Sequence, residues 1–176
     1  MIKNLKIGLD ADEVLDDFWN PYIARFGLPK DDYEITKNCF KLRRDKQFWT
    51  TLPTLHRPTF TPTLICTKRT SRKEYLKQWL IENDYPVVPI YQVFYQYGSK
   101  APYIKGRVDL FVDDSVRNFL DLNKNGVPCL LMDNPANQHL GPMLRIHSLD
   151  EHEIEEVFYL AKELNIFNDF NKYYDC

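Results

Sequence analysis

The chain has 176 residues, of which 44% are hydrophobic, and its formal net charge at pH 7 is -2. A chain of this length can bury one sizeable core, so we expect a single domain over residues 1–176 that carries one small insertion. The nearly balanced charge excludes a global basic field, which argues against nucleic acid as a partner and requires any bound anion to be held locally.

The cysteine content and the hydropathy of the chain indicate where it resides. Cys39, Cys66, Cys129 and Cys176 are widely scattered, and this spacing argues against a disulfide framework or a zinc site. No stretch approaches the roughly 18 apolar residues of a membrane span, and the amino terminus shows no apolar targeting core. We therefore expect a soluble, cytoplasmic protein that has no membrane partner.

The first structural unit is expected near the amino terminus. Residues 6–11, KIGLDA, predict a buried strand. Apolar side chains then recur at helical spacing from Val14 to Phe26, and Gly27 ends this expected helix. Pro21 is expected to kink or shorten the helix.

Strands and helices continue to alternate along the chain. Further strands are expected at residues 63–67, 87–94, 108–112 and 128–132, and further helices at residues 71–84, 115–125 and about 150–165. Ser71 and Glu74 have the spacing of a capping box, and Gly126 is placed to end the helix before it. This alternation predicts an α/β fold with a Rossmann-like, mostly parallel five-stranded sheet and helices on both faces.

Residues 26–62 interrupt the alternation. The segment is rich in proline, charge and aromatic residues and contains no clear strand. We interpret it as a small cap insertion that covers the site. Its basic run, residues 41–46, is expected to be a solvated face rather than a nucleic-acid groove.

Polar side chains stand at or near the ends of three expected strands. Because the carboxyl ends of parallel strands meet at one edge of a sheet, a single site is expected there. Its members are Asp10, Asp12, Thr67, Lys100, Asp113 and Asp114. Lys105 competes with Lys100 for the lysine position.

These residue types suit phosphoryl transfer, in which the protein mainly positions a phosphate and offsets its charge. Asp10 can act as a nucleophile, and Asp12 can act as the general acid and base. Thr67 and Lys100 can hold phosphoryl oxygens. Carboxylates converging on a phosphate would repel it by several kcal/mol at an effective dielectric of about 20, so a divalent cation is required, and Mg²⁺ prefers such oxygen ligands.

Four segments that carry these residues also resemble the motifs of the haloacid dehalogenase (HAD) superfamily of phosphatases. LDADEVLDDF is similar to the first motif and LICT to the second; GSK ahead of APYIKGRVDLFVDDS is similar to the third, and LFVDDS to the fourth. Their order and their strand-end context agree. The resemblance implies a HAD-like fold with a small helical cap, and an aspartyl-phosphate intermediate.

Within the superfamily, FWTTLP, the ICT strand and RIHSLDEHEI most resemble the 5'(3')-deoxyribonucleotidase group. This implies hydrolysis of nucleoside or deoxynucleoside monophosphates, with the insertion acting as a cap over the base. The resemblance further implies that Mg²⁺ is bound by the Asp10 side chain, the Asp12 carbonyl and one or both of Asp113 and Asp114.

Two features depart from that group. Glu13 replaces the usual glycine after the second aspartate and adds a carboxylate beside an anionic substrate. Lys68 and Arg69 add positive charge just beyond Thr67, where Lys68 is expected to help hold phosphate and Arg69 to contact substrate. Four aromatic residues could stack on a base: Phe18, Trp19, Phe48 and Trp49.

Two other functions stay open at this point. The chain could be a phosphatase for another small phosphate ester or for a nucleic-acid terminus. It could also be a catalytically weak HAD-like domain that serves as a binding or structural component, which Glu13 favours.

Overall fold

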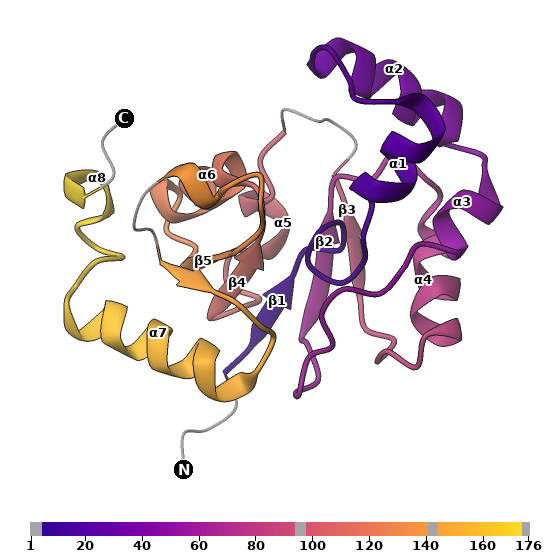
Figure 1. Ribbon diagram of the computed structural model, residues 1–176. Helices are drawn as coiled ribbons and strands as arrows, with labels where there is room; N and C mark the ends of the chain where they lie inside the picture. The colour runs from indigo at the N-terminus through magenta and orange to yellow at the C-terminus, as the bar shows by residue number, and fades with distance from the viewer. Residues whose placement is uncertain (1–4, 94–97, 141–143, 174–176) are drawn as a thin grey trace.

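The computed structural model describes residues 5–93, 98–140 and 144–173. It contains a parallel sheet with the strand order β3-β2-β1-β4-β5-β6 (Figure 1). The strands are β1 (Ile7–Leu9), β2 (Leu64–Thr67), β3 (Ile90–Gln92), β4 (Leu110–Asp113), β5 (Cys129–Met132) and β6 (Arg145–Ile146). The predicted α/β class with a parallel sheet is confirmed.

The predicted number of five strands is corrected to six. β6 consists of Arg145 and Ile146 alone and pairs with β5 through Leu131↔Arg145 and Met132↔Ile146. Two residues are too short to produce a recognisable pattern, so pairing rather than sequence identifies this strand. Phe94, the expected end of the third strand, and Cys176 lie outside the described residues.

The central strand β1 is packed closely by both of its neighbours. Gly8 pairs with Leu64 of β2 and with Phe111 of β4. A Cβ atom on Gly8 would lie 2.8 Å from Cδ2 of Phe111 and 3.0 Å from Cγ1 of Val108. The absence of a side chain at this position therefore lets the Phe111 ring pack against the β1 backbone.

The chain changes direction in the sheet at β1. It proceeds from β1 to β2 and β3 on one side, then crosses over to β4, which pairs with the other side of β1. Such a switch point opens a crevice beyond the carboxyl ends of the two strands, where α/β proteins bind ligands.

Helices lie on both faces of the sheet. Figure 1 shows α3 and α4 on one side, and α5 and α6 on the other. The helices are α1 (Trp19–Phe26), α2 (Asp32–Leu42), α3 (Lys46–Thr50), α4 (Lys73–Glu82), α5 (Ala101–Ile104), α6 (Val116–Lys124), α7 (Glu151–Glu163) and α8 (Phe170–Tyr173), with a short 3-10 helix at Gln138–Leu140. Among the described residues, no helix is long and apolar enough to cross a membrane.

The first helix begins later than its apolar spacing predicts. Residues 11–17 form a tight turn, in which the amide of Leu15 bonds the carbonyl of Ala11 at 2.8 Å and that of Glu13 bonds the carbonyl of Asp16 at 2.7 Å. Helix α1 starts only at Trp19. Pro21 lies in its first turn, where an amide has no intrahelical partner, so the predicted kink does not occur.

The predicted capping box before α4 is absent. The cap residue is Arg72, and the buried Ser71 hydroxyl has no hydrogen-bond partner among the described residues. Gln92 of β3 donates its side-chain amide to the carbonyls of Arg69 and Ser71, at 2.6 and 2.5 Å. These bonds hold the segment against β3 and delay the start of the helix.

The segment 26–62 contains α2 and α3, each begun by an aspartate. The Asp31 carboxylate accepts a bond from the amide of Glu34 at 2.8 Å, and Asp45 accepts one from Phe48 at 3.0 Å. Figure 1 shows α1 and α2 beyond the carboxyl ends of β1 and β2. The function of this segment as a cap stays a prediction.

Candidate active site

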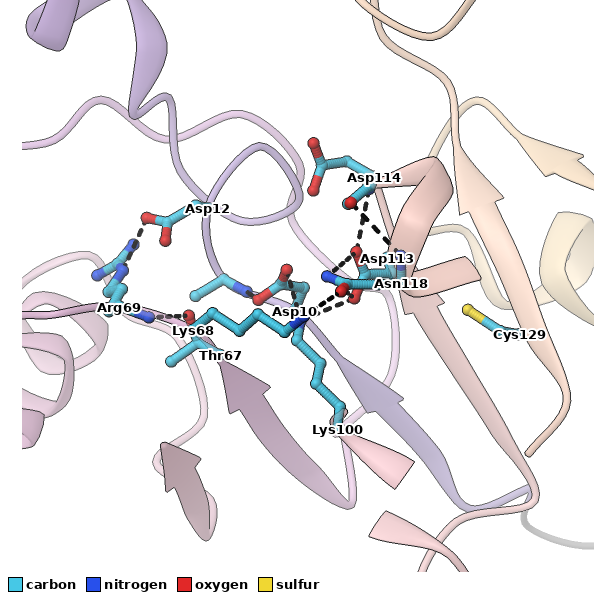
Figure 2. Close-up of polar contacts among 12 residues, drawn as sticks. Asp10, Asp12, Thr67, Lys68, Arg69, Lys100, Asp113, Asp114, Asn118 and Cys129 are labelled. Carbon is cyan, nitrogen blue, oxygen red and sulfur yellow. Dashed lines mark hydrogen bonds and ion pairs between the residues drawn. The ribbon is translucent and has the colours of Figure 1, made fainter. Parts of the chain in front are cut away.

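Three aspartates meet at the switch point between β1 and β4. Asp10 follows β1, Asp113 ends β4, and Asp114 is the next residue. The amide of Asp10 donates to the carbonyl of Val112 at 2.9 Å, which holds the two strand ends side by side. Each aspartate can offer one oxygen such that the three atoms lie within 4.8 Å of one another (Figure 2).

Lys100 lies beneath these carboxylates. Its fully buried side chain places Nζ 2.6 Å from Oδ2 of Asp10 and 2.7 Å from Oδ2 of Asp113 (Figure 2). Burial alone would lower the pKa of Lys100, but the charges of Asp10 and Asp113 outweigh this effect and raise the pKa above its ordinary value. Lys105, the alternative considered from sequence, instead donates to the carbonyl of Asn125 at 2.7 Å.

The three carboxylates form a donor set that fits a hard divalent cation. Lys100 compensates two of them, whereas Asp114 has no cationic partner among the described residues. Burial and the charges of Asp113 and Asp10 raise the pKa of Asp114 well above its ordinary value. A magnesium ion bound by oxygens of these aspartates would remove that repulsion.

Asn118 orients Asp113, and sequence reasoning missed it. From the first turn of α6, its Nδ2 atom donates to both carboxylate oxygens of Asp113, at 3.0 and 3.2 Å. The amide of Ser115 adds a further bond to Oδ1 of Asp113 at 3.0 Å. The one available signal was its position five residues after Asp113, about one helical turn into the helix that follows β4.

Thr67 and Lys68, the predicted phosphate-binding residues at the end of β2, lie near Asp113 and Asn118. Thr67 is buried and ends β2, the neighbour of β1. Lys68 donates from Nζ to Oδ1 of Asn118 at 2.6 Å, which connects it through Asn118 to Asp113 (Figure 2). Burial, followed by the charge of Lys100, lowers the pKa of Lys68.

The side chain of Asp12 points away from the other aspartates and toward Arg69 (Figure 2). Nε of Arg69 lies 2.8 Å from Oδ1 of Asp12, and Nη2 of the same guanidinium bonds Asp16. The guanidinium also stacks on the Trp49 ring, 5.2 Å from its centroid. Arg69 is fully buried by these contacts, and in the structure it orients Asp12. Its contact with substrate stays a prediction.

Glu13 has the left-handed backbone conformation that normally favours glycine, with φ at 59°. Its Oε1 atom accepts bonds from the amides of Phe18 and Trp19, both at 2.9 Å, at the start of α1. Burial raises the pKa of Glu13 to about 7. The carboxylate that departs from the expected pattern is therefore directed at a helix terminus.

Three of the four predicted base-stacking aromatic residues pack in the core. Phe18 stacks on Trp49 with ring centroids 5.7 Å apart, and Phe48 contacts Trp49 edge-on at 5.2 Å. These three rings pack against one another, and their contact with substrate stays a prediction. Trp19 is half-buried and lines a surface pocket together with Glu13.

The loop after β5 also contacts the cluster of Asp10, Asp113 and Asp114, which we call the acidic group. Asn134 donates from Nδ2 to Oδ2 of Asp114 at 3.1 Å. Asn137 donates to the carbonyls of Asp114 and Met132, at 2.9 and 2.8 Å, and Arg145 of β6 bonds Asn137 in turn. No sequence signal pointed to these asparagines, because nothing local distinguishes them from ordinary turn residues.

Comparison with solved structures identifies the fold. The chain is similar to a HAD-superfamily hydrolase of subfamily IA, variant 1, from Geobacter sulfurreducens PCA, with a TM-score of 0.55 and 16% identity, covering 83% of this chain and 96% of that chain. A dehalogenase structure has a TM-score of 0.49 and 10% identity, covering 85% of this chain and 96% of that chain. No protein-family model and no curated protein sequence matches.

The first of these similarities shows that the chain has the fold of HAD-superfamily hydrolases. The expected HAD-like architecture is thereby confirmed. The narrower resemblance to the deoxyribonucleotidase group receives no support from the structures compared, and it stays a prediction.

Proposed function

We propose that this chain is a magnesium-dependent phosphatase that hydrolyses small phosphate monoesters through an aspartyl-phosphate on Asp10. The observation that carries the proposal is the grouping of Asp10, Asp113 and Asp114 around Lys100 at the switch point of the sheet. Two of these carboxylates share the buried ammonium of Lys100, and Asp114 has no cationic partner among the described residues, so a bound cation and a phosphate would complete the charge balance of the three.

The proposed reaction uses two carboxyl groups in turn. An oxygen of Asp10 attacks phosphorus, and the bond between phosphorus and the ester oxygen breaks while the Asp12 carboxyl gives its proton to that oxygen. The alcohol leaves. The Asp12 carboxylate then takes a proton from the water that attacks phosphorus, the bond from Asp10 to phosphorus breaks, and phosphate is released. Magnesium, when bound, offsets the charge on the phosphoryl oxygens.

The orientation of Asp12 assigns its two oxygens different tasks. Oδ1 accepts the bond from Arg69, whereas Oδ2 has no hydrogen-bond partner among the described residues. We assign the proton transfers to Oδ2. Lys100, Lys68 and Thr67 are then the groups that hold the remaining phosphoryl oxygens.

The narrower proposal for the substrate is a nucleoside or deoxynucleoside monophosphate. It rests on the sequence resemblance given above and on a pocket of about 650 Å³ beside the acidic group, a volume within the usual range for small-molecule sites. Another small phosphate ester is the alternative.

The test is phosphate release from a panel of 5' and 3' nucleoside monophosphates, in ribo and deoxy form, and from simple aryl and sugar phosphates, with Mg²⁺ or with a chelator. We expect turnover that requires Mg²⁺ and falls by at least about 10³-fold in Asp10→Asn, because the amide is not a nucleophile. Acid quenching of the wild type with radiolabelled substrate should trap label on the protein.

The control variant is Asp84→Asn, an exposed aspartate after α4 with φ at 56°, a conformation that asparagine tolerates. It should retain wild-type activity. Release of phosphate from no member of the panel by folded wild-type protein would contradict the proposal and favour a binding role. Turnover that favours sugar phosphates would contradict only the nucleotide assignment.

A further inference from the structure

A pocket of about 650 Å³ lies between the start of the insertion and the loop after β5. Its lining includes the apolar side chains of Trp19, Ile23 and Leu55 and the polar side chain of Asn134. Because Asn134 also bonds Oδ2 of Asp114, the pocket and the acidic group share a wall. Glu13, next to Asp12 in the chain, lines it as well. A phosphate at the acidic group would therefore extend its alcohol part into this pocket.

The charged residues that line the pocket are all acidic. They are Glu13, Asp17 and Asp133, and among the described lining residues none is a lysine or an arginine. Asp133 is neutralised by Arg145, whose Nη1 atom lies 2.8 Å from Oδ1. Burial lowers the pKa of His56, the one histidine in the described lining, and thereby disfavours its cationic form.

Asp17 carries most of the negative charge of the pocket at neutral pH, because burial raises the pKa of Glu13 to about 7. Asp17 accepts bonds from the backbone amide and the side-chain amide of Asn20, at 2.9 and 2.7 Å, and Glu13 accepts bonds from the amides of Phe18 and Trp19. Neither has a basic partner among the described residues. Of the cations near Asp10, Asp113 and Asp114, Arg69 is paired with Asp12 and Asp16, and Lys100 with Asp10 and Asp113, whereas Lys68 bonds Asn118 and does not line the pocket.

We propose that this pocket selects phosphate monoesters whose alcohol part has an apolar ring and no negative charge, and that it rejects alcohols with a second phosphate or a carboxylate. The inference rests on the proposed phosphatase function and narrows its substrate class. The Trp19 face and the aliphatic side chains accept the ring, and the Asp17 carboxylate, which lines the pocket, repels an anionic substituent.

The first experiment uses three aryl phosphates of nearly equal size, which differ in the charge of their para substituent: 4-(2-aminoethyl)phenyl, 4-propylphenyl and 4-(2-carboxyethyl)phenyl phosphate. We expect kcat/KM of the wild-type protein to be roughly tenfold or more lower for the carboxylate ester than for the propyl ester, since a like charge a few ångströms away opposes binding. The amino ester should equal or exceed the propyl ester.

The second experiment places a cation in the pocket. Leu28 lines it and is 78% exposed, so Leu28→Lys should fold normally. We expect this variant to raise the ratio of kcat/KM for the carboxylate ester to kcat/KM for the propyl ester about fivefold. The matched control is Leu160→Lys on α7, where the leucine is 54% exposed and lines none of the described pockets. It should change neither value.

The outcomes separate the two proposals. Equal kcat/KM for all three esters in the wild type, or equal effects of Leu28→Lys and Leu160→Lys, would overturn the inference and leave the phosphatase function intact. Hydrolysis of none of the esters, when the nucleotide panel also gives no phosphate, would overturn the proposed function and the inference with it. The inference would be established by a lower kcat/KM for the carboxylate ester than for the other two esters, together with a change in kcat/KM that Leu28→Lys produces and Leu160→Lys does not.

Discussion

The backbone conformation at position 13 explains why glycine suits this position and what glutamate must compensate there. The turn after β1 requires φ at 59°, a conformation that glycine adopts without cost and that costs other L residues about 1–2 kcal/mol. In this chain the carboxylate accepts bonds from the amides of Phe18 and Trp19 at the start of α1, and these bonds offset the strain.

The strain at Glu13 predicts an unusual order of stability. Glu13→Ala and Glu13→Gly both lose the carboxylate, but only alanine keeps the strain, so Glu13→Gly should be about 1 kcal/mol more stable. The measurement is the free energy of unfolding in urea. The matched control is Glu156, an exposed residue within α7. There the Glu156→Gly protein should be less stable than the Glu156→Ala protein by a similar free energy of unfolding. The same order at both positions would contradict this account.

At the same scale, the site residues differ in how far sequence could predict them. Asp10, Asp113 and Asp114 were predicted to lie together because each stands where a buried strand ends, and the ends of parallel strands converge. Asn118 bonds Asp113 from five residues further along the chain, and Asn134 bonds Asp114 from the loop after β5. Asparagine is common at helix starts and in turns, so neither position stands out in the sequence. The burial of Arg69 could not be foreseen, because a basic residue after a strand is ordinarily exposed.

At the scale of the elements, sequence predicted the longer strands and helices and missed those defined by tertiary contacts. β4 and β5 were recognised from continuous apolar runs, whereas the two residues of β6 depend on pairing with β5. The start of α1 was placed too early because Val14 and Leu15 are apolar and buried, but they belong to the turn. Apolar spacing alone cannot separate a buried turn from the first turn of a helix.

The close packing of β1 against β4 predicts the effect of adding one methyl group. In Gly8→Ala the new Cβ would meet Phe111 at 2.8 Å and Val108 at 3.0 Å. Because a buried ring cannot move freely in a dense core, we expect a loss of about 1–3 kcal/mol in the free energy of unfolding, measured by chemical denaturation. If Gly8→Ala were as stable as the wild-type protein, β1 and β4 would be less tightly packed than these distances indicate.

At the scale of the whole molecule, the acidic group joins two parts of the chain that are distant in sequence. Asp10 belongs to the first strand of the sheet, whereas Asp113 and Asp114 follow the crossover from β3. A cation held between them binds only when both parts are assembled, so its binding free energy adds to the stability of the fold.

We therefore expect Mg²⁺ to raise the melting temperature of the wild-type protein relative to protein in chelator. At a concentration of 100 times Kd the gain corresponds to about 2.7 kcal/mol. In Asp114→Asn this gain should be lost, while the variant without metal should be more stable than the wild type, because a repelled, partly buried charge is removed. Equal stabilisation of both proteins by Mg²⁺ would show that the cation binds elsewhere.

The position of β1 in the sheet also bears on how the protein is made. Ile7 emerges from the ribosome well before its partner Leu110, which follows 103 positions later in the chain. Until then β1 can pair with β2 alone, and its other edge stays open for association with other chains. Native pairings this distant in sequence also slow folding. A nascent chain that ends before β4 should therefore depend on chaperones, and Asp10, Asp113 and Asp114 can come together only after β4 has been synthesised.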